Sequence, residues 1–111
     1  GTAAAFATDP LALAIAVQAV ELGFDRHLLP VQRWFIYLPF EHSEVRADQE
    51  RSRALWSGLA DDPASAGAIA FAQRHWEVID RFGRFPHRNQ ILGRTNTPEE
   101  TAFLQEPGSS F

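Results

Sequence analysis

Proline stands at the expected start of a helix four times in this sequence, at Pro10, Pro30, Pro63 and Pro98. Proline suits the first helical turn because its fixed φ angle is helical and the N–H that it lacks would have no partner there. Alternation of apolar and polar residues never persists over four positions between turn signals, so no segment has the pattern of a half-buried strand. The sequence therefore predicts an all-α fold.

Stop signals divide the chain into about five helices. Gly23 and Gly83 suit the left-handed residue that follows a helix, and Pro39 is expected to break or kink its helix. Residues 97–100, Thr-Pro-Glu-Glu, form a capping box in which the threonine and the second glutamate satisfy each other's backbone donors. Residues 83–96 are expected to form a loop. The predicted helices cover residues 10–22, 29–38, 43–60, 63–82 and 97–105.

The predicted helices differ in the faces that they bury. The helix over residues 10–22 is apolar on nearly every side, which indicates burial all round. We expect His75 to be a core histidine with one satisfied ring nitrogen, and the Gln49 amide to bond a backbone group left free near Pro39. The inward seam of residues 43–60 consists of Val45, Gln49, Ser52, Trp56 and Leu59. That of residues 63–82 consists of Ala68, Phe71, His75, Ile79 and Phe82.

Composition narrows the classes of function. The 111 residues fit a single domain over residues 1–111 with a modest core, and the absence of cysteine excludes disulfides and thiolate sites. The net charge of −4 argues against general nucleic-acid binding. Residues 74–94 differ from the rest of the chain in carrying a net positive charge, with five arginines against Glu77 and Asp80. These arginines either hold a small anionic ligand or pair with carboxylates elsewhere in the domain.

Neither a membrane span nor a targeting segment is visible. The apolar run over residues 11–20 is interrupted only by Gln18 and is shorter than the roughly 20 residues that a bilayer span requires. Residues 1–9 contain none of the basic residues that precede the apolar part of a secretory signal. We therefore expect a soluble, cytoplasmic protein that does not associate with a membrane.

Two polar segments are candidates for a functional site. Residues 81–89, Arg-Phe-Gly-Arg-Phe-Pro-His-Arg-Asn, place burial-seeking rings beside groups that then need hydrogen-bond partners. Glu41, His42 and Glu44 either prepare a histidine as a general base or cap the following helix and bond the arginine-rich segment. Because both segments combine aromatics with unsatisfied polar groups, we expect them to meet. The candidate ligand-binding residues are Glu41, His42, Glu44, Gln49, Arg84, His87, Arg88 and Asn89.

The polar cluster has two interpretations. In one, the arginines, histidine and asparagine of residues 84–89 hold a carboxylate or phosphate, whose geometry matches the arginine fork. In the other, which we favour, the cluster is a staple in which Arg84 or Arg88 pairs with a glutamate of residues 41–44. A metal held by His42 and His87 has no support from the spacing. No metal and no cofactor is therefore expected.

Three segments resemble the domain-of-unknown-function 924 family. They are residues 37–44, Tyr-Leu-Pro-Phe-Glu-His-Ser-Glu, residues 49–52, Gln-Glu-Arg-Ser, and residues 82–89, Phe-Gly-Arg-Phe-Pro-His-Arg-Asn. The ending, residues 106–111, is also similar, and the similarity covers essentially the whole chain. The resemblance implies a bacterial helical protein with antiparallel helix pairs in a tetratricopeptide-like, right-handed arrangement. The family lacks an established activity.

The resemblance also implies a partner. Family members are typically longer, so this chain is expected to match the C-terminal two-thirds of the family domain, with the N-terminal third absent. Another chain is then expected to bury two apolar features, the helix over residues 10–22 and the rings of Trp34 and Phe35. Soluble monomers rarely expose large apolar patches. We expect this other chain to be the separate N-terminal portion, or a second copy in a homo-oligomer.

Two functions of different classes follow from these residues. The first is a binding or scaffold module whose polar Glu/His/Arg cluster holds a small anionic ligand or a peptide. The second is a hydrolase-like enzyme that uses His42 or His87 as general base, with arginines steadying an anionic substrate. No serine lies in a Gly-x-Ser-x-Gly setting, which favours binding and leaves enzymatic activity and catalytic residues open.

Overall fold

The computed structural model describes residues 9–111, and between these residues it contains six α-helices and no strand. The α-helices are α1 Asp9–Glu21, α2 Pro30–Glu41, α3 Arg46–Ser57, α4 Ala66–Phe82, α5 Asn89–Leu92 and α6 Pro98–Phe103. Short 3-10 helices are η2 Phe24–His27, η3 Pro63–Ser65 and η4 Pro86–Arg88. The predicted all-α fold is confirmed. No helix in this range is both long and apolar enough to cross a membrane.

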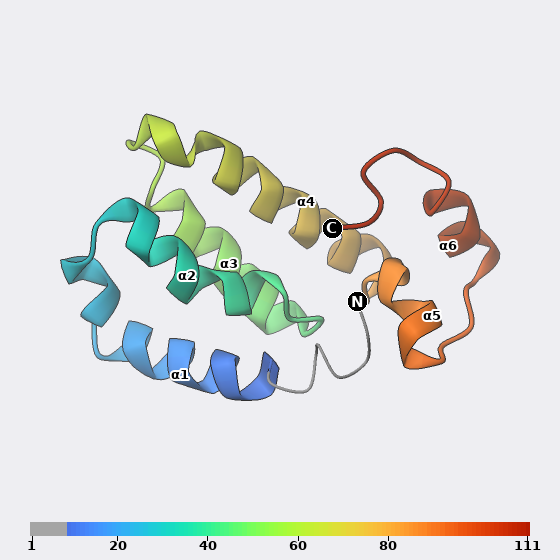
Figure 1. Cartoon of the computed structure of the whole chain (residues 1–111), viewed down its shortest axis with the longest axis horizontal. Helices are drawn as coiled ribbons and strands as arrows, with labels where there is room; N and C mark the ends of the chain where they lie inside the picture. Colours follow the sequence, from blue (N-terminus) through green and yellow to red (C-terminus); the bar gives the residue numbers. More distant parts are fainter. Residues whose placement is uncertain (1–8) are drawn as a thin grey trace.

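The first four α-helices lie side by side, and the chain reverses direction between one and the next (Figure 1). Each packs against the helix that follows it, from α1 to α4. The short α5 and α6 lie at one end of this layer, and the final segment returns to α4 (Figure 1). This arrangement agrees with antiparallel pairing, while the tetratricopeptide-like detail stays a prediction.

Two separate hydrophobic clusters hold the fold together. The first joins α2, α3 and α4 through Tyr37, Trp56, Leu59 and Ala72, with the rings of Tyr37 and Trp56 edge to face at 5.7 Å. The second lies at the C-terminal end of α4 and contains Val78, Ile79 and Phe85. The segment after α4 therefore has a core of its own, which attaches it to the end of that helix.

Local signals set several helix ends as expected. Gly83, with a φ of 73°, follows α4 in the left-handed conformation. Thr97 and Glu100 form the predicted capping box, in which Glu100 N donates to Thr97 Oγ1 at 3.1 Å and Thr97 N donates to Glu100 Oε1 at 2.9 Å. Thr8, which precedes Asp9 and Pro10 at the predicted start of the first helix, lies outside the described residues, and the described helix begins at Asp9.

Several boundaries differ from the sequence prediction, including the start of the fourth helix, where η3 occupies residues 63–65 before α4. α2 is not broken at Pro39 and continues to Glu41, because a proline in the last turn removes only one helical hydrogen bond. α3 begins at Arg46, and Val45 before it is exposed rather than part of the seam. The expected loop over residues 83–96 contains η4 and α5, whose single turns are too short to give a periodic pattern.

Burial of the first helix was predicted wrongly. Only Ala16 of α1 is buried, while Leu11 and Ile15 are 64% and 60% exposed. α1 is the outer helix of the layer and packs mainly on α2, which leaves Leu11 and Ile15 on its exposed side. Phe71, expected in the seam of α4, is also exposed.

Candidate functional site

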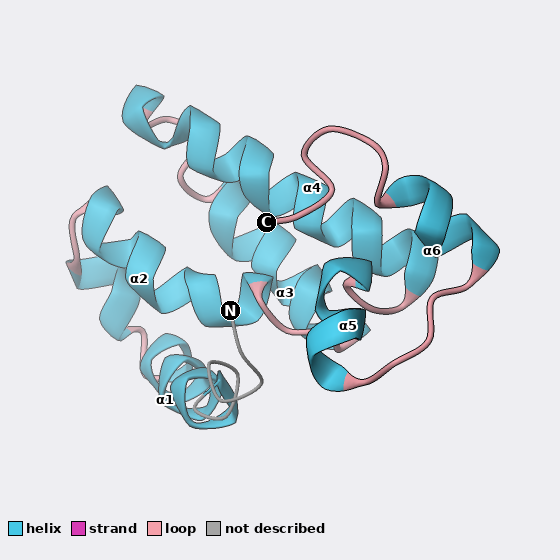
Figure 2. Cartoon of the chain, turned by 45° about the vertical axis from the view of Figure 1, so that its right-hand side comes forward, coloured by secondary structure: helices cyan, strands magenta, loops and turns pink. Residues whose placement is uncertain are grey.

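The corner after α2 and the arginine-rich segment after α4 meet, as the sequence predicts. The backbone N–H of Phe85 donates to Glu44 Oε2 at 2.6 Å, and Arg88 Nη2 donates to the carbonyl of His42 at 2.8 Å. In Figure 2, α5 lies beside the loop that joins α2 to α3. Segments more than forty residues apart therefore form one polar junction.

Arg94 is the cation of this junction, and sequence reasoning missed it. Its guanidinium donates to both carboxylate oxygens of Glu44, at 2.8 and 3.0 Å, and to Asn89 Oδ1 at 2.9 Å. Burial alone would raise the pKa of Glu44, but the hydrogen bonds from Arg94 and Phe85 outweigh it and lower that pKa. An arginine–glutamate pair does join the two segments, but it is made by Arg94, which the prediction did not name.

Arg84 belongs to a second ion pair. It donates through Nε and Nη2 to the two carboxylate oxygens of Glu100, at 2.8 and 2.7 Å, and to the carbonyl of Thr95. These bonds lower the pKa of the buried Glu100 to about 2. The prediction that Arg84 pairs with Glu41 or Glu44 was therefore wrong, since Arg84 fastens α6 to the start of the segment after α4.

Two of the candidate amides have structural roles. Gln49 is fully buried, and its Nε2 donates to the carbonyls of Glu41 and Ser43 at 2.6 and 2.7 Å. This confirms that an inward amide of α3 satisfies backbone groups at the end of α2. The buried Asn89 donates to Asn96 Oδ1 at 2.8 Å, so it fixes the segment after α5.

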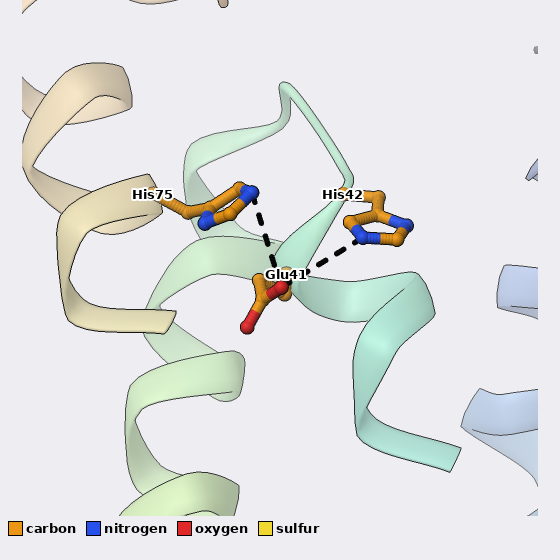
Figure 3. Close-up of side chains that lie close together, drawn as sticks. All are labelled: Glu41, His42 and His75. Carbon is orange, nitrogen blue, oxygen red and sulfur yellow. Dashed lines mark ion pairs between the residues drawn. The ribbon is translucent and has the colours of Figure 1, made fainter. Parts of the chain in front are cut away.

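Glu41, His42 and His75 form a compact group, here called the Glu–His–His cluster (Figure 3). Glu41 is the last residue of α2 and is 1% exposed, His42 follows it at the surface, and the buried His75 projects from α4. Glu41 Oε2 lies 3.7 Å from His42 Nε2 and 3.9 Å from His75 Nε2. The core position of His75 is confirmed, but its proximity to Glu41 was not foreseen.

Hydrogen bonding sets the protonation of this cluster. His75 Nδ1 lies 2.8 Å from the carbonyl of Phe71, which can only accept, so Nδ1 carries the proton and Nε2 faces Glu41 with a lone pair. Burial lowers the pKa of His75 to about 4 and raises the pKa of Glu41 to about 7. Burial, followed by the charge of Arg88, also lowers the pKa of His42. Both imidazoles are therefore neutral at neutral pH, the form in which they bind metals or accept protons.

His87 does not belong to the cluster. Its ring lies near those of Phe85 and Phe111, with centroids 5.8 and 5.7 Å away. Burial is the main cause that lowers its pKa. The ligating atoms of Glu41, His42 and His75 lie within 4.8 Å of one another, so among residues 9–111 the structure pairs His42 with His75 where sequence reasoning paired it with His87.

A pocket of about 500 Å³ opens beside the exposed side of this cluster. Its walls are mainly apolar side chains of α1 and α2, and its polar end includes His42, Glu44 and Arg88 of the candidate site. The other five candidate residues do not line it. The lining residues are Asp9, Pro10, Ala12, Leu13, Phe35, Leu38, Pro39, His42, Ser43, Glu44, Val45, Asp48, Arg88 and Leu92.

Comparison with known proteins assigns the chain to a family. The family model described as "Bacterial protein of unknown function (DUF924)" matches residues 1–108. This chain belongs to that family. The predicted membership is confirmed, and the match spans essentially the whole chain, a small departure from the predicted C-terminal two-thirds.

A solved structure of a protein of unknown function from Agrobacterium tumefaciens is similar to this DUF924 chain. The two share 43% identity and superpose with a TM-score of 0.85 over 95% of this chain. The chain spans 57% of the length of that protein. A comparison with curated proteins gave no match. The family match and this structure support the helical fold, and both are described as proteins of unknown function.

Proposed function

We propose that this chain is a binding module that holds a small anionic ligand with an apolar portion in the pocket between α1, α2 and α5. One observation carries the proposal: apolar side chains such as Leu13 and Leu38 line the same pocket as His42 and Arg88. The volume of about 500 Å³ is within the range of small-molecule sites.

An anion at the polar end of the pocket would be held by Arg88, in competition with the carboxylate of Asp9, which also lines the pocket and whose charge acts on Arg88. Glu44 is already paired with Arg94, and Asp48 accepts a hydrogen bond from Ser43 at 2.6 Å. Arg88 supplies a planar guanidinium, the group best suited to a carboxylate. A carboxylate attached to a hydrocarbon chain matches this lining better than a free inorganic anion, because most of the walls offer no hydrogen bond.

Octanoate, with octanol as the uncharged analogue, tests the proposal by isothermal titration calorimetry. We expect saturable binding of octanoate, weaker binding of octanol, and about a tenfold loss of octanoate affinity in Arg88→Gln. Arg53→Gln is the matched control, since Arg53 lies over the ring of Trp76, away from the pocket lining. No saturable binding, or equal affinity of octanoate for the two variants, would refute the anionic pocket.

A hydrolase-like activity with His42 as general base is the second candidate. Glu41 lies 3.7 Å from His42 Nε2, where a carboxylate can orient the ring, and His42 lines the pocket whereas His87 does not. Ser43 also lines the pocket, but its hydroxyl donates to Asp48 and not to His42. Water is therefore the nucleophile in this scheme. Hydrolysis of p-nitrophenyl esters that is lost in His42→Ala would support it, and rates equal in both proteins would exclude it.

A macromolecular partner is also proposed, on the apolar side chains that α1, α2 and their connection expose. We propose that a second copy of the chain packs on this face, because patches of this kind rarely face solvent on monomers. The exposed side chains are Leu11, Ile15, Leu22, Phe24, Leu29, Val31 and Phe35.

A further inference from the structure

We infer that the Glu–His–His cluster, at the junction of α2 and α4, binds a divalent transition-metal ion of the zinc class. The ligating atoms of its three side chains all lie within 4.8 Å of one another. The inference is independent of the ligand proposed for the pocket, because it is tested with the metal ion alone and without that ligand.

The donor set selects the class of metal. Two imidazole nitrogens and one carboxylate oxygen suit Zn²⁺, Co²⁺ or Fe²⁺, whereas Mg²⁺ and Ca²⁺ prefer oxygen ligands throughout. The ligand atoms of a tetrahedral zinc ion are about 3.3 Å apart. The observed separations of 3.7 and 3.9 Å from Glu41 Oε2 to the two histidines, and the limit of 4.8 Å that covers all three pairs, are wider, so binding requires side-chain rotations that draw the three ligands together.

An unsatisfied carboxylate oxygen points to a missing positive group. Glu41 is 1% exposed, and its Oε2 atom has no hydrogen-bond partner among the described residues. That oxygen is directed toward both histidine rings (Figure 3). Burial of a carboxylate without a partner is costly, and a bound cation removes that cost.

The orientation of His75 matches that of a metal ligand. Histidine ligands usually donate their second ring N–H to a carbonyl or a carboxylate, which fixes the tautomer and aims the other nitrogen at the metal. His75 makes this bond to the carbonyl of Phe71, and its Nε2 faces Glu41. The stacked ring of Phe111, 3.9 Å away, holds the imidazole in place from one face.

The cluster supplies three ligands from the chain, which leaves a fourth position for water or a substrate. Three protein ligands with one open position are typical of catalytic rather than structural zinc sites. His42 is the exposed member and also lines the pocket, so it provides the route by which an ion reaches the two buried ligands.

Titration of the tag-free chain with Co²⁺ and Zn²⁺ tests the site. We expect one ion per chain, visible absorption bands of histidine-bound Co²⁺, displacement of Co²⁺ by Zn²⁺, and no displacement by Mg²⁺. His42→Ala and Glu41→Gln should weaken binding by at least about tenfold, the loss that even outer-shell changes cause at metal sites. His27→Ala is the matched control, an exposed histidine of η2 outside the cluster, and should bind Co²⁺ as the parent chain does.

His42 is at the surface, so His42→Ala keeps the test decisive even if Glu41→Gln does not fold, which circular dichroism would show. Failure of the parent chain to bind Co²⁺ or Zn²⁺ would overturn the inference. So would binding that His42→Ala leaves unchanged, or that His27→Ala weakens equally.

Discussion

Arg94 shows how one side chain fastens two distant parts of this chain. Its guanidinium joins Glu44 after α2 to Asn89 of α5, and it also donates to the carbonyl of Phe85 at 3.2 Å. The pair with Glu44 is three-quarters buried, with side chains 26% and 25% exposed. Its loss therefore removes the ion pair from the Glu44 carboxylate and the donor from Asn89 Oδ1 in a poorly hydrated place.

We expect Arg94→Ala to lower the free energy of unfolding by about 2 kcal/mol, because it strands these acceptors. Arg46→Ala is the matched control, since Arg46 pairs with Asp80 in an exposed bridge and should cost less than about 1 kcal/mol. Urea unfolding of both variants measures the difference. Equal losses of unfolding free energy in the two variants would mean that the Arg94–Glu44 pair contributes no more than an exposed salt bridge.

Glu100 gives the chain a defined sensitivity to acid. Its pKa in the folded chain, about 2, is lower than the ordinary value of 4.5, so the folded state binds fewer protons than the unfolded state between these values. The stabilisation is complete above about pH 5 and is lost as the pH falls toward 2.

In Glu100→Gln, we expect a lower melting temperature at pH 7 and a smaller decrease between pH 5 and pH 3 than in the parent chain. The amide cannot ionise, so it takes no part in this linkage. Thermal melts followed by circular dichroism at several pH values measure how steeply the melting temperature of each protein falls with pH. Parallel curves for the two proteins would assign the acid sensitivity to other carboxylates.

At the scale of elements, the end of α2 depends on α3. The Gln49 amide bonds the carbonyls of Glu41 and Ser43, which the end of the helix leaves without helical partners. We expect Gln49→Leu to cost about 1–3 kcal/mol, because the shape is kept and the buried acceptors lose their donor. Gln18→Leu on the exposed face of α1 is the control, and urea unfolding is the measurement. A cost no larger than that of the control would show that water replaces the amide.

Local signals explain which elements were predictable. Caps, prolines and glycines act within a few residues, so the end of α4 and the start of α6 could be read from the sequence. α5 could not, because a single helical turn has no periodicity. The site was predicted in part: the meeting of the two polar segments followed from their unmet hydrogen bonds. The pairing of Glu44 with Arg94, fifty residues away, and of Glu41 with His75 depends on how α2 and α4 pack, which no local pattern encodes.

For the whole molecule, the exposed apolar face predicts self-association. We expect light scattering to give a mass above the 12.4 kDa of one chain, because a second copy removes apolar surface of α1 and α2 from water. Leu11→Ser combined with Ile15→Ser should shift the mass toward the monomer, since both side chains are on the same exposed face. Val45→Ser, an exposed position beside α3, is the control. A parent chain that is monomeric at all concentrations would refute the second copy.

The two hydrophobic clusters imply that this small chain unfolds in two steps. α4 contributes Ala72 to one cluster and Val78 and Ile79 to the other, and His75 lies between them. The segment after α4 is thus a cooperative unit that can open while α1 to α4 stay folded. Amide exchange should show lower opening free energies over residues 84–111 than over α3, whereas an ion bound by Glu41 and His75 would join α2 to α4 within the first unit.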